Sequence, residues 1–81
     1  MRVLAPDAVA VKALPDYRLL VEFANGETRI FDAAPLLERK CYAVLKSVEV
    51  FNLVRIAYGT VVWPGNLDID PEWLYEDSVV A

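Results

Sequence analysis

Hydrophobic and polar residues alternate over the first third of the chain, and this pattern predicts β-strands. The positions that share one face of the first two segments are Val9, Val11 and Ala13, then Tyr17, Leu19, Val21 and Phe23. A third strand is expected over residues 27–31. The beginning of the chain is therefore expected to form a three-stranded antiparallel meander.

The dipeptide Asn25-Gly26 predicts a tight hairpin between the second and third strands, because both residues tolerate the positive φ of a type I′ turn. A two-residue loop would place Val21 opposite Ile30 on one face and Glu22 opposite Arg29 on the other. Opposed charges of this kind contribute about 0.2–1 kcal/mol.

The turn between the first two strands is less simply predicted. A two-residue loop at Pro15-Asp16 would pair Lys12 with Leu19 and mix the two faces. A three-residue loop would pair Ala13 with Leu19 and keep the faces sorted. Since a slip of one residue moves every side chain to the other face, we expect the longer loop or a bulge.

The middle of the chain is expected to be helical. Asp32 is a predicted cap for a turn that begins near Ala34-Pro35, since proline is tolerated in a first helical turn. Ser47 is the next predicted cap, for a short helix over residues 48–53. The β-branched residues in these segments lower their helix propensity.

A second hairpin is predicted from residues 54–57 and 60–63 around Tyr58-Gly59, and residues 64–66 end it. A final helix then starts with Asp70 as N-cap, Pro71 at the first position and Glu72 near the positive end of the helix dipole. This helix is expected to run to about Asp77.

The predicted order β-β-β-α-α-β-β-α separates strands from helices, which indicates an α+β fold. We expect one small domain over residues 1–81, with an antiparallel sheet of about five strands: a three-stranded meander, two short helices, a β-hairpin and a C-terminal helix.

Hydrophobic residues make up 57% of the sequence. A domain of this length has little interior, so part of the apolar surface is expected outside, where exposed patches mark a partner or an oligomer interface. We therefore expect either a small protein partner or a homodimer.

The net charge is −4. Nucleic-acid binding draws most of its affinity from basic residues, so the charge argues against direct contact with DNA or RNA and suits a basic protein partner. No segment has the apolar length of a membrane span or the pattern of a signal peptide, and Cys41 is the only cysteine. A cytoplasmic location is expected.

The sequence contains no histidine, which excludes catalytic arrangements that need one and zinc sites of the Cys/His type. We expect no enzymatic activity and no cofactor. Cys41 follows the basic pair Arg39-Lys40, which would favour a thiolate, but the preferred interpretation is a buried or half-buried side chain that acts as a small apolar residue.

Acidic residues gather near the C-terminus, and the set comprises Asp68, Asp70, Glu72, Glu76 and Asp77. Carboxylate-rich loops bind calcium or magnesium, but this segment lacks the spacing and the turn glycine of an EF-hand loop. Helix capping, solvation or contact with a basic partner is preferred, and no metal site is predicted.

The aromatic residues are expected to form the core rather than a ligand pocket. They are Tyr17, Phe23, Phe31, Phe51, Trp63 and Trp73. Trp63 precedes Pro64 at the end of a strand, where a partly exposed indole would suit an interface. The candidate interface residues are therefore Trp63, Trp73, Asp68, Asp70 and Glu72.

Four segments, residues 14–19, 23–27, 60–66 and 68–76, resemble the family catalogued as domain of unknown function 2442. The resemblance covers about residues 7–78. It implies a small bacterial or archaeal protein without established activity. Some members carry a C-terminal helix-turn-helix domain, which this chain lacks up to Ala81, and many lie beside another small uncharacterised gene.

Three functions remain open at this point. The leading hypothesis is a protein-interaction module, an antitoxin-like or regulatory partner of another small protein. The alternatives are a DNA-associated regulatory domain that works with a separate helix-turn-helix chain, and a small-ligand-binding domain.

Overall fold

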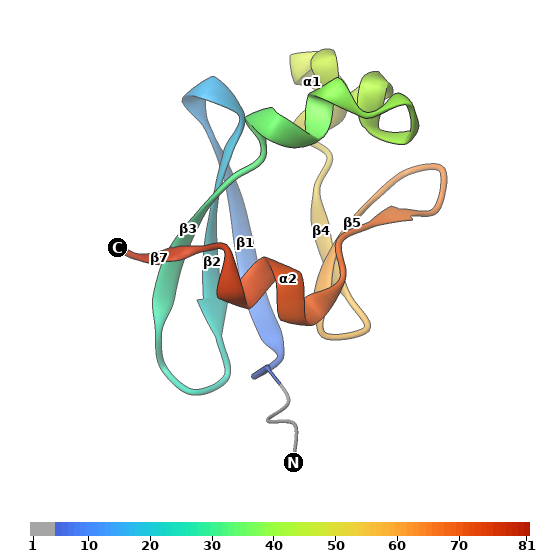
Figure 1. Cartoon of the computed structure of the whole chain (residues 1–81). Helices are drawn as coiled ribbons and strands as arrows, with labels where there is room; N and C mark the ends of the chain where they lie inside the picture. The colour runs from blue at the N-terminus through green and yellow to red at the C-terminus, as the bar shows by residue number, and fades with distance from the viewer. Residues whose placement is uncertain (1–4) are drawn as a thin grey trace.

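The computed structural model describes residues 5–81. Residues 1–4, in the N-terminal segment where a signal peptide would begin, lie outside the described residues. In chain order the elements (Figure 1) are β1 (Ala8–Leu14), the 3₁₀ turn η1 (Pro15–Tyr17), β2 (Arg18–Phe23), β3 (Thr28–Asp32), the 3₁₀ helices η2 (Ala34–Glu38) and η3 (Lys40–Lys46), α1 (Val48–Phe51), β4 (Arg55–Ala57), β5 (Thr60–Trp63), β6 (Leu67–Asp68), α2 (Pro71–Glu76) and β7 (Val79–Val80). The predicted α+β class is confirmed.

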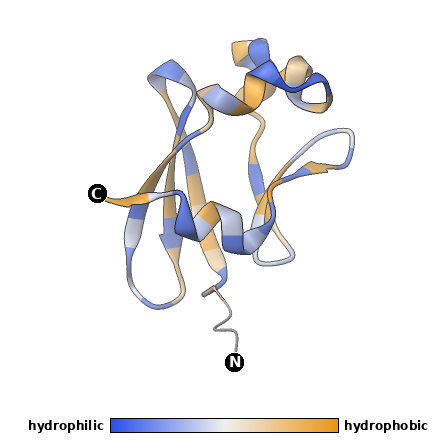
Figure 2. Cartoon of the chain, viewed as in Figure 1, coloured by the Kyte–Doolittle hydropathy of each residue, from blue (hydrophilic) through white to orange (hydrophobic). Residues whose placement is uncertain are grey.

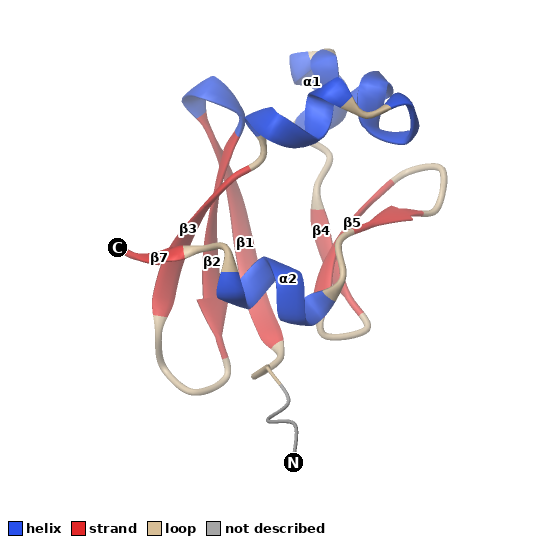
Figure 3. Ribbon diagram, in the orientation of Figure 1, coloured by secondary structure: helices blue, strands red, loops and turns tan. Residues whose placement is uncertain are grey.

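The strands form two antiparallel sheets rather than one (Figure 3), with the orders β1-β2-β3-β7 and β4-β5-β6. The prediction of about five strands missed Leu67–Asp68 and Val79–Val80. Two residues are too few to show a period-two pattern, so these strands depend on neighbours that tertiary structure brings to them.

The predicted register of the β2–β3 hairpin is wrong by one residue. Val21 lies opposite Arg29 instead of Ile30, and Glu22 lies opposite Thr28. The side chain of Arg29 is therefore on the inner face, with Val21, and not on the solvent face with Glu22.

The hairpin loop has three residues. The Phe23 amide donates to the Glu27 carbonyl at 2.8 Å, and the Gly26 amide donates to the Phe23 carbonyl at 3.0 Å. Gly26 has φ 89°, whereas Asn25 is not among the residues with positive φ. The loop is therefore a turn closed by one left-handed glycine, not the predicted type I′ turn.

The β1–β2 connection confirms the longer loop. Ala13 lies opposite Leu19 across the three residues of η1. A register shift between Ala8 and Ala10 buries Ala8 and leaves Val9 50% exposed. The expectation that Val9 shares the inner face is therefore wrong, because the bulge turns that side chain outward.

One of the three predicted helix caps is present: the Ser47 hydroxyl accepts the Val50 amide at 3.4 Å. The Asp32 carboxylate accepts the Ala34 amide at 3.0 Å, but Ala33 rather than Asp32 occupies the N-cap position of η2. Asp70 occupies the N-cap position of α2, but its side chain makes no cap hydrogen bond. The helix α1 ends at Phe51 rather than at residue 53, and η3 was not predicted.

The core lies between the two sheets, with η2, η3 and α1 at one end and α2 in contact with both β3 and β5 (Figure 1). All four residues of β5 are buried. The Trp63 indole is 1% exposed and donates to the Phe51 carbonyl at 3.0 Å. None of the helices within the described residues is long and apolar enough to cross a membrane.

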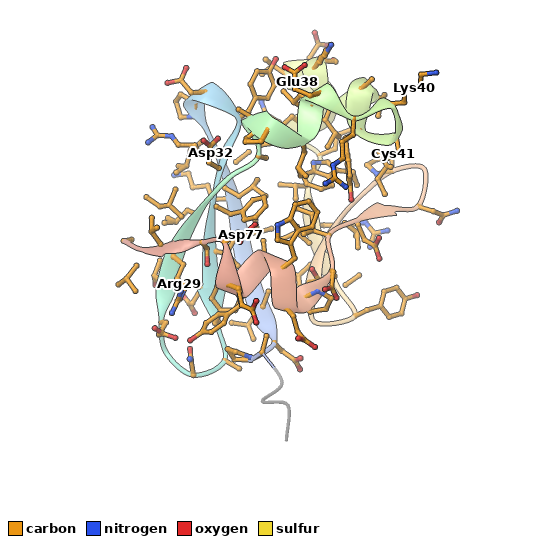
Figure 4. All side chains as sticks on the ribbon, in the orientation of Figure 1. Arg29, Asp32, Glu38, Lys40, Cys41 and Asp77 are labelled. Carbon is orange, nitrogen blue, oxygen red and sulfur yellow. The ribbon has the colours of Figure 1, made fainter. Side chains whose placement is uncertain are left out.

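The positively charged side chain of Arg29, on the inner face of the sheet, joins the β2–β3 hairpin to the C-terminal segment (Figure 4). The Arg29 guanidinium donates to the Tyr75 carbonyl at 3.3 Å and to the Ser78 carbonyl at 3.2 Å, and it lies 4.0 Å from the centre of the Tyr75 ring. It also pairs with the Glu27 carboxylate at 3.1 Å. These four residues, Arg29, Glu27, Tyr75 and Ser78, form the Arg29 cluster.

Arg29 brings hydrogen-bond donors and a positive charge to the carboxyl end of α2. The last carbonyls of a helix have no partner inside the helix and attract cations. Arg29 donates to the Tyr75 carbonyl, which also accepts the Ser78 hydroxyl at 2.7 Å, and β7 follows directly after Ser78 to pair with β3. The cluster therefore fixes α2 and β7 against the hairpin.

The Glu27 carboxylate accepts hydrogen bonds from the Tyr75 hydroxyl, the Asn25 amide and Arg29. The Tyr75 bond has the largest effect, then Asn25, and together with Arg29 they lower the pKa of Glu27 below its ordinary value of 4.5. The carboxylate form is thus favoured in the folded chain.

Replacing Arg29 by methionine is expected to lower the free energy of unfolding by about 2–3 kcal/mol, because it removes the charged donors to two backbone carbonyls and the cation over the Tyr75 ring. Urea denaturation measures the change. Arg55→Met, at an exposed position on β4, is the matched control and should stay within about 0.5 kcal/mol of the original chain. Equal losses in both variants would contradict a special role for Arg29.

The lowered pKa of Glu27 predicts acid sensitivity. Its contribution to stability is complete above pH 4.5, the ordinary pKa, and is lost as the pH falls through the lower pKa of the folded chain. Glu27→Gln should therefore flatten the fall of the urea midpoint below pH 4.5. Glu38→Gln, at an exposed position on η2, should leave that fall unchanged; an unchanged profile in Glu27→Gln would reject the assignment.

Candidate functional site

One face of the sheet β1-β2-β3-β7 packs on the core, and the opposite face is open to solvent. We call the second the outer face; its side chains form three rows across the strands. The middle row is Lys12, Leu20, Ile30 and Val79, which the pairing places opposite one another. Leu20 and Ile30 are half-buried, and Val79 is 65% exposed. The outer face thus carries an apolar row across three strands.

Polar residues border this row on both sides. Leu14, Arg18 and Asp32 lie opposite one another on one side, and Ala10, Glu22 and Thr28 on the other. A shallow depression of about 130 Å³ lies on the face beside Leu20 and Glu22. An apolar strip with a charged border has the composition of a protein-contact surface.

The outer face continues to an edge of the sheet. The strand β7 pairs with β3 through Val79 and Val80, and its other side has no strand partner within the described residues. Val80 is 64% exposed, and Figure 2 shows this end of the sheet as hydrophobic. Exposed edge strands with apolar side chains can pair with another chain.

A second apolar surface lies between η1 and α1. It is a groove of about 380 Å³ whose lining includes Leu14, Tyr17, Val48 and Phe51. The rings of Tyr17 and Phe51 meet edge to face at 5.3 Å, and they form the floor of the groove. The groove contains few polar groups and no arrangement of catalytic side chains.

A third depression, of about 240 Å³, lies beside the β4–β5 turn and includes Arg55, Tyr58 and Asp68. The predicted two-residue turn is confirmed, since Ala57 pairs with Thr60. Tyr58 has φ 54° and is 95% exposed, so it adopts a left-handed conformation without the compensation of packing.

The two tryptophans of the predicted interface occupy different environments. Trp63 is buried, so the expectation of a partly exposed indole is wrong; its N–H reaches the Phe51 carbonyl within the core. Trp73 is half-buried against Phe31, donates to the Asp77 carboxylate and has the Arg39 guanidinium 5.3 Å from its ring centre. The structure therefore does not bring Trp63 and Trp73 together on a surface.

The acidic residues of the predicted interface lie around the start of α2. Asp68 is exposed on β6, and its backbone carbonyl accepts the Tyr42 hydroxyl at 2.7 Å. Asp70 and Glu72 occupy the N-cap and the first turn of α2. Within residues 5–81, no group of three metal-ligating side chains is placed to hold an ion. Burial, followed by the charges of Cys41 and Asp68, raises the pKa of Tyr42.

Cys41 is an exposed free thiol near the start of η3 (Figure 4). The expectation of a buried or half-buried small apolar residue is therefore wrong. The single cysteine has no nearby histidine, because the sequence contains none.

The sequence patterns missed the outer face. Leu20 interrupts the apolar–polar alternation of β2, and this extra apolar residue was the available signal. Ile30 was assigned to the core side through the incorrect hairpin register. Val79 lies beyond the predicted end of the final helix at about Asp77, and no strand was predicted there.

The chain matches, over residues 8–79, the family model described as "Protein of unknown function (DUF2442)". No curated protein and no solved structure matches the chain.

Tyr58→Asn is expected to raise the free energy of unfolding by about 1 kcal/mol, because asparagine tolerates the left-handed conformation and the exposed Tyr58 ring makes no packing contact worth keeping. Thermal unfolding measures the change. Tyr17 has a similar φ of 59°, but its ring packs on Phe51, so Tyr17→Asn should lower the stability instead. A loss in both variants would contradict strain at Tyr58.

Proposed function

The chain belongs to the DUF2442 family, whose function is unknown, and from that premise we propose that it is a protein-interaction module that binds through its outer face. The observation that carries the proposal is the apolar row of Leu20, Ile30 and Val79 on a sheet face that no other element of residues 5–81 covers. Leaving such a row in water costs free energy that a protein partner would recover by covering it.

The charges around the row support a protein partner rather than a nucleic acid. Arg18 and Lys12 on the outer face are accompanied by Glu22 and Asp32, so the face has no excess of positive charge. The whole chain has a net charge of −4. Phosphate binding requires a concentration of basic side chains, whereas a mixed border gives orientation between two proteins.

The proposal does not include catalysis. The absence of histidine excludes triads that use it as a base, and the grooves described above are lined mainly by apolar or isolated polar groups. Binding alone is the role that these surfaces support.

The finer part of the proposal is a regulatory, antitoxin-like role toward another small protein. Its support is the acidic net charge, which suits a basic partner, and the gene neighbourhood that the family resemblance implies. Discovery that the cellular partner is large, strongly acidic or a second copy of this chain would reject this finer part and leave the interaction module in place.

A photoreactive amino acid in place of Glu22 tests the proposal in cells of the source organism. We expect one discrete cross-linked adduct, because residue 22 lies at the border of the apolar row. Mass spectrometry identifies the linked protein, whether it is a second copy or another chain.

Two controls make this experiment specific. The same photoreactive group in place of Lys40, an exposed residue of η3, should give no adduct of that mass. Adding Leu20→Glu to the first variant should abolish the adduct. No adduct from position 22, or an adduct unaffected by Leu20→Glu, would overturn the proposal.

A further inference from the structure

We propose that the occupant of the outer face is a second copy of this chain, packed face to face in a symmetric dimer. The inference rests on the proposed function, since it names the partner of the same surface. It is carried by the order of charges along β2, where Arg18 and Glu22 lie two residues on either side of Leu20. All three side chains belong to the outer face.

A twofold axis determines which residues meet in such a dimer, because each contact is repeated in reverse. An axis that runs across the strands, along the middle row, keeps each strand opposite its own copy and reverses its direction. Leu20 then faces Leu20 of the partner subunit, and Arg18 faces Glu22 of the partner subunit. Two reciprocal ion pairs therefore border one apolar centre.

The other in-plane axis gives the opposite result. An axis parallel to the strands through β2 would place Arg18 opposite Arg18 of the partner subunit and Glu22 opposite Glu22 of the partner subunit. Like charges placed directly opposite each other across an interface are destabilising. The charge order thus favours an axis across the strands over an axis along them.

The charged groups are available for these contacts. Glu22 is exposed and has no hydrogen bond or ion pair with another described residue. Arg18 makes one long hydrogen bond, from Nε to the Pro15 carbonyl at 3.4 Å. Lys12 would face Lys12 of the partner subunit at the end of the row, where its long side chain can extend into solvent.

The middle row of the outer face also supplies apolar side chains for the rest of the proposed interface. Ile30 and Val79 continue the centre from β3 to β7, so each would face its own copy. Four strands spaced by about 4.8 Å make a face roughly 19 Å wide, so the interface is small and a weak dimer is expected. The dimer is therefore expected to dissociate in the micromolar range, on the order of 10 μM.

Sedimentation velocity over a concentration series tests the geometry through a charge exchange. Arg18→Glu would place two glutamates at each ion-pair position, and Glu22→Arg would place two arginines there. Each variant should weaken dimerisation about tenfold or more, whereas the double variant Arg18→Glu/Glu22→Arg should restore it to within about threefold.

Controls with the same changes of net charge exclude a general charge effect. Lys40→Glu on η3 and Glu38→Arg on η2 change exposed residues, and each should leave the dissociation constant of the dimer unchanged. Far-ultraviolet circular dichroism checks that each variant is folded. A monomeric original chain up to about 1 mM, or a double variant no better than the single ones, would overturn the dimer.

The two proposals fail in different ways. If the original chain is monomeric but position 22 cross-links to another protein, the dimer is rejected and the interaction module stands. If position 22 gives no adduct and the chain is monomeric, both are rejected.

Discussion

The structure depends on a guanidinium that lies on the inner face of a sheet. Turning Arg29 toward the core requires acceptors that replace water, since an unpaired charge there would be strongly destabilising. The carbonyls of Tyr75 and Ser78 supply them, and Glu27 supplies a carboxylate. Polar contacts of Arg29 therefore join a strand in the first half of the chain to a helix near its end.

This constraint also determines the surface. A sheet alternates its side chains, so placing Arg29 inward with Leu19, Val21 and Phe23 leaves Leu20 and Ile30 outward. The alternative register would have exposed an ion pair between Glu22 and Arg29 and covered Ile30. The apolar outer face is thus a direct consequence of the polar contacts on the inner face.

Local signals in the sequence predicted local structure well. The Tyr58-Gly59 turn, the three-residue β1–β2 loop and the Ser47 cap each involve residues close in sequence, and all three are present. The β2–β3 register failed because its deciding partners lie 46 and 49 residues away from Arg29. Trp63 was misplaced for a similar reason: its acceptor, the Phe51 carbonyl, becomes available only when α1 packs on β5.

The candidate site was predicted in kind but not in position. An excess of apolar residues in a short chain indicated exposed hydrophobic surface, and the outer face is such a surface. The β2–β3 register determines which residues form the outer face. The predicted interface residues, two tryptophans and three acidic residues, are therefore not the residues of this face.

The arrangement of the described elements leaves one face of the larger sheet without a covering layer. Stable domains bury each apolar sheet face against another layer. Here α2, the helices η2, η3 and α1, and the second sheet all pack on the inner face of the sheet β1-β2-β3-β7. The described helices are too few and too short to cover both sides of the larger sheet. A second copy would supply such a layer, and the opposite charges on either side of Leu20 favour one orientation of that copy.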